Sequence, residues 1–402
     1  MRKITLRLLA LIGGGLLGCA AALAALMLVV KAPSFFFFGL GLIALEWAPW
    51  MLLLAGTAFM LTWLGRRAAG KALRRVLFGL SGGALLALAV VWILALTQPP
   101  AVTTNIDAIA AQAPGSFDRR AFLFSPSFEA VAVTRDVVYD RVDGQALTLD
   151  VYALPGSAAR GTPALVVVHG GSWRGGDKGE FAEQSKAWAA AGYVVFDVAY
   201  RLAPRYRFPT AVQDVQCALA FIEAEASRFG HDPSRIALVG RSAGAQIVLV
   251  VAYAGAAPEL SPRCPARVDG LRAVVGYYAP TRMSYYDIIQ PELSPGALDD
   301  YLGGSPEAYP EAYRRARPVT WVGPDTPPTL VLHGRRDQFV RTLDPVALGE
   351  ALAAAGRPYG VIVLPWANHG FDVNRTGTSN QRVQPFVDVF LDRFVRKASS
   401  AP

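Results

Sequence analysis

The chain has 402 residues, of which 53% are hydrophobic, and it carries 39 Lys and Arg against 31 Asp and Glu. This length exceeds one ordinary domain, and the apolar content is high for a soluble enzyme. Residues 1–100 hold nine basic residues and one acid, whereas the other 302 residues hold 30 of each. The net charge of +8 therefore belongs to the apolar first part and is no sign of nucleic-acid binding.

Three apolar runs in this first part are long enough to cross a bilayer at roughly 20 residues per helix. We predict spanning helices at residues 5–30, 40–65 and 76–97 within a transmembrane region 1–98. The middle run already begins at Ser34, so the start of its helix is left open. The alternative for the first run is a signal peptide, because it has a basic start and small residues.

Basic residues give an orientation for three spans. They cluster at residues 2–7 and 66–75, whereas the loop between the first two runs has only Lys31. Basic loops stay in the cytoplasm, so everything after residue 97 is expected on the other side of an inner or plasma membrane, in the periplasm of a Gram-negative cell. The lipid bilayer is then a partner. Glu46 in the middle run indicates either a functional membrane site or an interfacial position.

Residues 99–129 are predicted to form a linker, and residues 130–402 one catalytic domain in which strand and helix patterns alternate. This alternation predicts an α/β fold, with a mostly parallel sheet of about eight strands and helices on both faces. Residues 281–328 interrupt the pattern, and they indicate either a cap over the strand ends or an ordinary long loop. The expected strands cover 131–139, 147–152, 164–168, 193–200, 236–239, 271–278, 329–332 and 359–364, and the expected helices 181–191, 208–229, 346–355 and 383–397.

The motif Gly240-Arg-Ser-Ala-Gly244 separates the apolar run 236–239 from a second, alanine-rich run. A strand that turns into a helix within five residues needs glycine on both sides of the turn and presents Ser242 at its tip. A serine nucleophile also needs a general base. In this fold the acid and the histidine follow the serine along the chain, so Asp337 and His369, which follow the last two predicted strands, complete a Ser-Asp-His triad.

Other polar motifs are expected to support this chemistry. An oxyanion hole is predicted from backbone amides that follow the strand 164–168 and the nucleophile, and a plain turn is the alternative. Aromatic residues near the motifs either line an acyl pocket or belong to the core. The predicted oxyanion residues are Gly170, Gly171, Ser172 and Ala243, and the predicted pocket residues are Trp173, Trp366 and Phe371. We expect His333 to be structural and His231, before an Asp-Pro pair, to lie on the surface.

Cys217 and Cys264 lie in the part expected outside the cytoplasm, where a disulfide is permitted, and two unpaired thiols are the alternative. No Cys/His cluster has the spacing of metal ligands, so we expect no metal and no cofactor. Asn374-Arg-Thr376 is a glycosylation sequon only in a secretory pathway that uses it.

These motifs together resemble the α/β-hydrolase esterases over residues 130–398. His169-Gly-Gly-Ser-Trp173 and the elbow motif are similar to those of hormone-sensitive-lipase-like, feruloyl, acetyl-xylan and prenylcysteine methyl esterases, although Ser172 replaces a third glycine of the first group. The resemblance implies hydrolysis of a small acyl ester through an acyl-enzyme, and a structural Arg201–Asp214 ion pair. An arylformamidase-like amidase with the same triad and a non-catalytic binding module are the alternatives, and the substrate and oligomeric state stay open.

Overall fold

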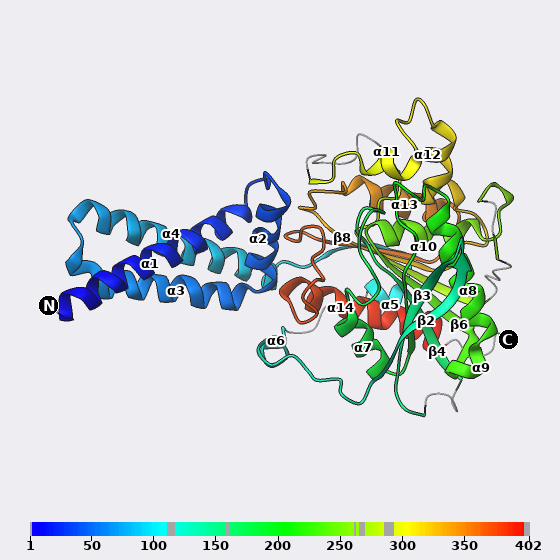
Figure 1. Cartoon of the computed structure of the whole chain (residues 1–402), viewed down its shortest axis with the longest axis horizontal. Helices are drawn as coiled ribbons and strands as arrows, with labels where there is room; N and C mark the ends of the chain where they lie inside the picture. The colour runs from blue at the N-terminus through cyan, green and yellow to red at the C-terminus, as the bar shows by residue number, and fades with distance from the viewer. Residues whose placement is uncertain are drawn as a thin grey trace. The chain divides into compact units, whose positions relative to one another are not determined.

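A computed structural model of the protein describes residues 2–110, 117–156, 161–260, 263–264, 270–284 and 293–397 (Figure 1). Contacts divide the chain into two compact units. The N-terminal unit comprises Met1–Pro99 and Pro365–Gln381, and the sheet unit comprises Pro100–Leu364 and Arg382–Pro402. The short piece 365–381, called the connecting segment below, therefore groups with helices that lie nearly 300 residues earlier in the chain.

The N-terminal unit is helical, and three of its helical stretches are long and apolar enough to cross a membrane: Lys3–Met27, Ala48–Ala68 and Lys71–Thr97. The predicted middle helix 40–65 is in fact two helices that meet at Trp47. Pro49 explains the break, because proline lacks an amide hydrogen and fits the first turn of a new helix. The elements are α1 (Arg2–Met27), α2 (Phe35–Glu46), α3 (Ala48–Gly65), η1 (Arg66–Ala68) and α4 (Lys71–Thr97).

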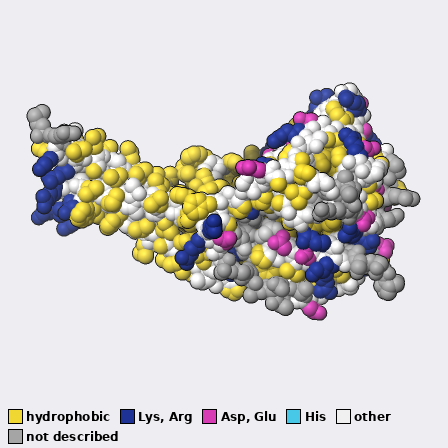
Figure 2. Space-filling model, turned by 90° about the horizontal axis from the view of Figure 1, so that it is seen from below, with side chains coloured by type: hydrophobic (Ala, Val, Ile, Leu, Met, Phe, Trp, Pro, Cys, Tyr) yellow, Lys and Arg dark blue, Asp and Glu magenta, His cyan; other side chains and the backbone are white. Residues whose placement is uncertain are grey.

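Glycines bring α1 and α3 together. A Cβ atom on Gly14 would lie 2.6 Å from the Thr62 nitrogen, and one on Gly65 would lie 2.7 Å from the Leu11 nitrogen. Small residues at a helix contact let the backbones approach, which is the usual packing of helices in a bilayer. Figure 2 shows hydrophobic side chains over the outer surface of these helices and Lys and Arg side chains gathered at one end.

In the described residues, the sheet unit contains nine strands in the order β1-β9-β8-β7-β6-β4-β5-β3-β2. The strands from β9 to β5 are parallel, and the outer pairs are antiparallel. This confirms the α/β fold. The strands are β1 (Ala101–Thr104), β2 (Ala132–Val142), β3 (Gln145–Ala153), β4 (Thr162–Val168), β5 (Val194–Val198), β6 (His231–Arg241), β7 (Leu271–Tyr277), β8 (Thr329–Gly334) and β9 (Tyr359–Leu364).

The ninth strand corrects the prediction that residues 99–129 form a linker. β1 pairs with β9 from Ala101 opposite Val363 to Thr104 opposite Gly360. Asn105 continues the contact, since its side chain donates to the Arg357 carbonyl and accepts the Tyr359 amide, at 2.9 and 2.8 Å. Within this range, residues 111–116 lie outside the described residues.

Helices cover both faces of the sheet, with α8, α10 and α13 on one face and α7 and α14 on the other (Figure 1). The predicted helix 208–229 is interrupted at Glu225, where α8 ends and α9 begins. The helices are α5 (Asp107–Ala110), α6 (Arg119–Leu123), α7 (Ala182–Ala190), α8 (Thr210–Ala224), α9 (Ala226–Phe229), α10 (Ala243–Ala254), η3 (Pro258–Leu260), α11 (Ala297–Leu302), α12 (Pro310–Ala316), η6 (Pro318–Trp321), α13 (Leu343–Ala354), α14 (Thr378–Leu391) and the π-helical η7 (Asp392–Arg396).

The central strands are buried over most of their length. Every residue of β4 is buried, as is the apolar part of β6. Continuous Val, Leu and Ile runs are what a parallel strand needs when helices cover both of its faces. Because β4, β6, β7, β8 and β9 are parallel, the loops that follow them leave the sheet at one edge.

Candidate active site

Ser242 forms a sharp elbow between β6 and α10. It is the single residue between the two elements, and its φ of 52° and ψ of −119° are strained for a residue with a side chain. A Cβ atom on Gly240 would lie 2.6 Å from the Ala245 Cα atom, and one on Gly244 would overlap the His169 carbonyl oxygen. Both glycines of the motif are therefore required by the turn.

The loop after β4 lies against this elbow. A Cβ atom on Gly170 would lie only 3.2 Å from the Ser242 Cβ atom. Gly171, Ser172 and Trp173 all have positive φ, at 102°, 53° and 60°. This run of left-handed residues turns the backbone sharply beside the serine, as a loop must do to present amides to a reacting oxygen.

Buried aromatic contacts hold the loop in place. The Tyr200 hydroxyl donates to the carbonyl oxygens of His169 and Gly170, at 3.2 and 3.1 Å, and the His169 ring stacks on Tyr200 with centroids 4.3 Å apart. Burial lowers the pKa of His169 to about 4. The imidazole is therefore neutral near pH 7 and serves as a structural part of the loop.

The end of the loop is tied to two buried carboxylates. The Gly179 amide donates to Asp197 at 2.9 Å, and burial raises the pKa of that carboxyl to about 7. The Lys178 ammonium lies 3.4 Å from Asp150 and 2.8 Å from Asp136. Lys178 thus ties the end of the loop to these carboxylates, whereas the exposed Asp177 carboxylate accepts the neighbouring Lys178 amide.

Asp337 lies in a tight turn three residues after β8. One carboxylate oxygen accepts the amides of Phe339 and Val340, at 2.8 and 2.9 Å, and the side chain is buried. The His333 ring binds the Val340 carbonyl oxygen at 3.0 Å and lies 3.6 Å from the Asp337 carboxylate. His333 therefore supports the turn that fixes Asp337, in agreement with its expected structural role.

His369 belongs to the connecting segment, five residues after the end of β9. It is 9% exposed, and its amide donates to the Asn368 side chain at 2.8 Å. Gly370 follows with a φ of +70°, so a turn directly follows the histidine. Ser242, Asp337 and the histidine follow the carboxyl ends of β6, β8 and β9, in the order expected of a triad.

A pocket opens at Ser242. It lies within the sheet unit, and the region 281–328 supplies much of its wall, although residues 285–292 of that region lie outside the described residues. Apolar side chains on this wall suit a hydrocarbon group. The lining includes Ser172, Trp173, Met283, Ala297, Leu298 and Phe339.

Trp173 is held in the pocket wall by contacts that the sequence did not reveal. Its indole nitrogen donates to the Gln246 side chain at 2.9 Å, and its ring stacks on Tyr301 with centroids 4.6 Å apart. The only available signal was a polar residue in the apolar helix α10. The other two predicted pocket residues, Trp366 and Phe371, are instead buried in the connecting segment, where the Trp366 indole donates to Ser379.

One further prediction is corrected by burial. His231 is 4% exposed at the start of β6, where its ring meets Phe196 edge to face, so it is no surface residue. Asn374 of the sequon donates its side-chain amide to the Glu46 carbonyl oxygen at 2.9 Å, and Glu46 itself is fully buried. Asn374 itself is half-buried, and the sequon stays a prediction that depends on the secretory pathway.

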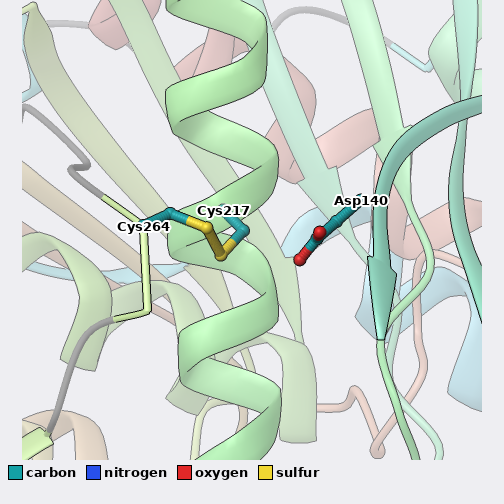
Figure 3. Close-up of side chains that lie close together, drawn as sticks. All are labelled: Asp140, Cys217 and Cys264. Atoms are coloured by element: carbon teal, nitrogen blue, oxygen red, sulfur yellow. A yellow bond between two sulfur atoms is a disulfide. The ribbon is translucent and has the colours of Figure 1, made fainter. Parts of the chain in front are cut away.

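Cys217 of α8 and Cys264 are joined by a disulfide, and the Asp140 carboxylate lies nearby (Figure 3). Oxygen and sulfur atoms of these three residues are close enough to surround an ion. A cysteine binds a metal ion as its thiolate, and a disulfide offers no thiolate. Asp140 instead accepts a hydrogen bond from Arg263 at 2.8 Å.

Comparisons with known proteins agree with this architecture. Residues 149–352 match the model of the BD-FAE family. The chain is 31% identical to Esterase LipC and 32% to the probable carboxylic ester hydrolase LipM, both of Mycobacterium tuberculosis, over 63% and 57% of this chain. These matches span 64% and 54% of the two relatives. The apo form of esterase 2 of Thermogutta terrifontis has the same fold, with a TM-score of 0.55 and 23% identity over 69% of this chain and 99% of its own. The chain belongs to the BD-FAE family of α/β-hydrolases.

Proposed function

We propose that the protein is a membrane-anchored serine hydrolase of carboxylic esters. The observation that carries this proposal is Ser242, held in a strained elbow at an apolar pocket, with the Gly170 backbone against it. Strained backbone at a pocket is typical of a functional site, and here it presents a hydroxyl where an acyl group would bind.

The reaction would proceed through an acyl-enzyme. The Ser242 oxygen attacks the acyl carbon while His369 takes the hydroxyl proton, and Asp337 orients the imidazole. His369 then gives the proton to the leaving alcohol oxygen. Water, activated by the same histidine, releases the acid and restores the serine.

Backbone amides would stabilise the negative oxygen of the tetrahedral intermediate. The candidates are those of the loop Gly170–Ser172 and of Ala243, the residue after the nucleophile. Such donors contribute on the order of 3 kcal/mol each. The positive φ angles of Gly171 and Ser172 support this role, since they turn the loop backbone toward the elbow.

The N-terminal helices would anchor the enzyme in a bilayer. Three stretches are long and apolar enough, and the Lys and Arg side chains gathered at one end of the unit mark the cytoplasmic side (Figure 2). The sheet unit would then lie outside the cytoplasm. A reporter enzyme that folds only outside the cytoplasm should be active when fused after Pro402. Activity of a reporter that works only in the cytoplasm, fused at the same point, would overturn this orientation.

The activity is tested with the full chain in detergent micelles, using p-nitrophenyl acetate, butyrate and octanoate. Ser242→Ala should abolish turnover and labelling by a fluorophosphonate, and the surface variant Ser234→Ala should retain both. A folded wild-type protein that neither turns over esters nor is labelled would contradict the proposal and favour a binding module. Faster cleavage of an aryl formamide than of any ester would identify an amidase instead.

A further inference from the structure

The connecting segment carries His369, and yet it is bound by α2. Its ends continue into β9 and α14 of the sheet unit, but its hydrogen bonds run to the end of a short helix in the N-terminal unit. α2 lies between the first two membrane-length stretches and is too short to be one of them. α2 ends in a buried acid, and a buried acid is stable only with hydrogen-bond partners.

This acid is Glu46, the last residue of α2, and its partner is Ser379 of the connecting segment. Its two carboxylate oxygens accept the Ser379 hydroxyl at 2.6 Å and the Ser379 amide at 2.9 Å. Ser379 is the second residue of α14, so the Glu46 side chain accepts a backbone amide that the first turn of the helix leaves without a partner. Glu46 is fully buried, and a buried acid requires such partners.

Neighbouring hydrogen bonds also join the end of α2 to the connecting segment. The Thr378 hydroxyl donates to the Leu45 carbonyl oxygen at 3.1 Å, and the Asn374 side chain donates to that of Glu46 at 2.9 Å. A Cβ atom on Gly377 would lie 3.0 Å from a Glu46 carboxylate oxygen. The same Cβ atom would lie 2.9 Å from the Asn374 carbonyl oxygen, so a methyl group at this position would require the segment to shift.

Contacts of the same kind reach residues on both sides of His369. The Ser379 hydroxyl, which donates to Glu46, also accepts the Trp366 indole hydrogen at 3.3 Å. Trp366 lies three residues before His369. On the other side of His369, a Cβ atom on Gly370 would lie 3.8 Å from the Leu42 side chain of α2. The residues that flank His369 are thus held from two directions.

We infer that Glu46 and Ser379 are positioning residues for His369, since they fix the segment of the same unit that carries it. This inference rests on the proposed role of His369 as general base. A base contributes about 100- to 10,000-fold to a rate, and a displacement of about 1 Å can cost about 100-fold. Loosening the segment should therefore reduce kcat.

The test uses the full chain in detergent micelles and the variants Ser379→Ala and Glu46→Gln. The matched control is Ser81→Ala, which removes a buried hydroxyl of α4 that bonds the Leu77 carbonyl oxygen of its own helix. We expect Ser379→Ala to lower kcat and the rate of fluorophosphonate labelling by about 10-fold or more, with KM changed less than about twofold. The acidic limb of its kcat/KM pH profile should also move, because that limb reports the protonation of the general base. Ser81→Ala should change neither kcat nor this limb.

A double variant sharpens the result. If Glu46 acts through Ser379, the double variant Glu46→Gln/Ser379→Ala should have about the kcat of the worse single variant, whereas independent effects would multiply. Values of kcat within about twofold of Ser81→Ala in both single variants would overturn the inference and leave the esterase proposal intact. A wild-type protein without turnover or labelling would contradict both the inference and the esterase proposal. If Ser379→Ala does not fold, Glu46→Gln decides by the same criteria.

Discussion

Arg201 binds Asp214 with both arms of its guanidinium group, Nε to Oδ2 at 2.9 Å and Nη2 to Oδ1 at 2.6 Å. The Arg201 amide also donates to the same carboxylate at 3.0 Å. Both side chains are buried. The pair ties the chain just after β5 to α8, and it confirms the structural ion pair that the family resemblance implied.

Removing one partner of this pair should destabilise the fold. Asp214→Asn leaves a buried guanidinium group without its counter-charge, which costs about 3–5 kcal/mol. Urea unfolding followed by tryptophan fluorescence would measure the loss. Glu183→Gln serves as the control, because its pair with Lys186 lies on the surface and contributes about 1 kcal/mol or less. Equal stability of the two variants would contradict the prediction.

Buried imidazoles should make stability fall in acid. Burial lowers the pKa of His231 to about 4, below its ordinary value of 6.5. Between these values only the unfolded chain binds the proton, so stability is present above pH 6.5 and is lost as the pH falls toward 4, by about 1.4 kcal/mol per pH unit. His169 contributes in the same direction. His231→Phe should therefore lose less stability than the wild type between pH 7 and pH 5, and identical losses would refute this.

Reduction of the disulfide should lower the melting temperature. The bond joins Cys217 to Cys264 across a sequence separation of 47 residues, and closing a loop of this size contributes about 2–4 kcal/mol. The melting temperature of the wild type should fall when reductant is added, and Cys264→Ser should be insensitive to it. Cys19→Ser is the control, since that cysteine is free and exposed. An unchanged wild type under complete reduction would count against the prediction.

The pocket wall should set the acyl length. Leu298 is buried in α11 and lines the pocket at Ser242. If the enzyme is the proposed esterase, Leu298→Trp should shorten the pocket and lower kcat/KM for p-nitrophenyl octanoate about 10-fold more than for the acetate. Leu298→Ala should shift the ratio the other way. A ratio that stays constant in both variants would place the acyl group elsewhere.

Local sequence signals predicted most of the sheet. β9 has the predicted bounds 359–364, and the elbow at Ser242 lies where its glycines placed it. These features depend on apolar runs and turn residues that lie close together in the sequence. β1 was missed because Ala101–Thr104 is short and becomes a strand only by pairing with residues some 255 positions later.

The same reason explains what the sequence left open or missed near the candidate site. Trp366 and Phe371 are aromatic residues beside His369, and nothing local distinguishes a pocket wall from the interior of the connecting segment. Glu46 was interpreted as a membrane or interfacial residue because its partner Ser379 is 333 positions away. His231 precedes an Asp-Pro pair that is typical of a surface turn, but β6 already begins at this residue.

The pairing of β1 with β9 determines where a soluble fragment of this protein can begin. A fragment cut at residue 130, the predicted start of the domain, would lack β1 and leave one side of β9 with unpaired amides and carbonyls. β9 has the apolar sequence Tyr-Gly-Val-Ile-Val-Leu, and an exposed edge of that kind recruits strands from other molecules. Such a fragment is expected to aggregate, whereas one that begins at Pro100 keeps the edge covered.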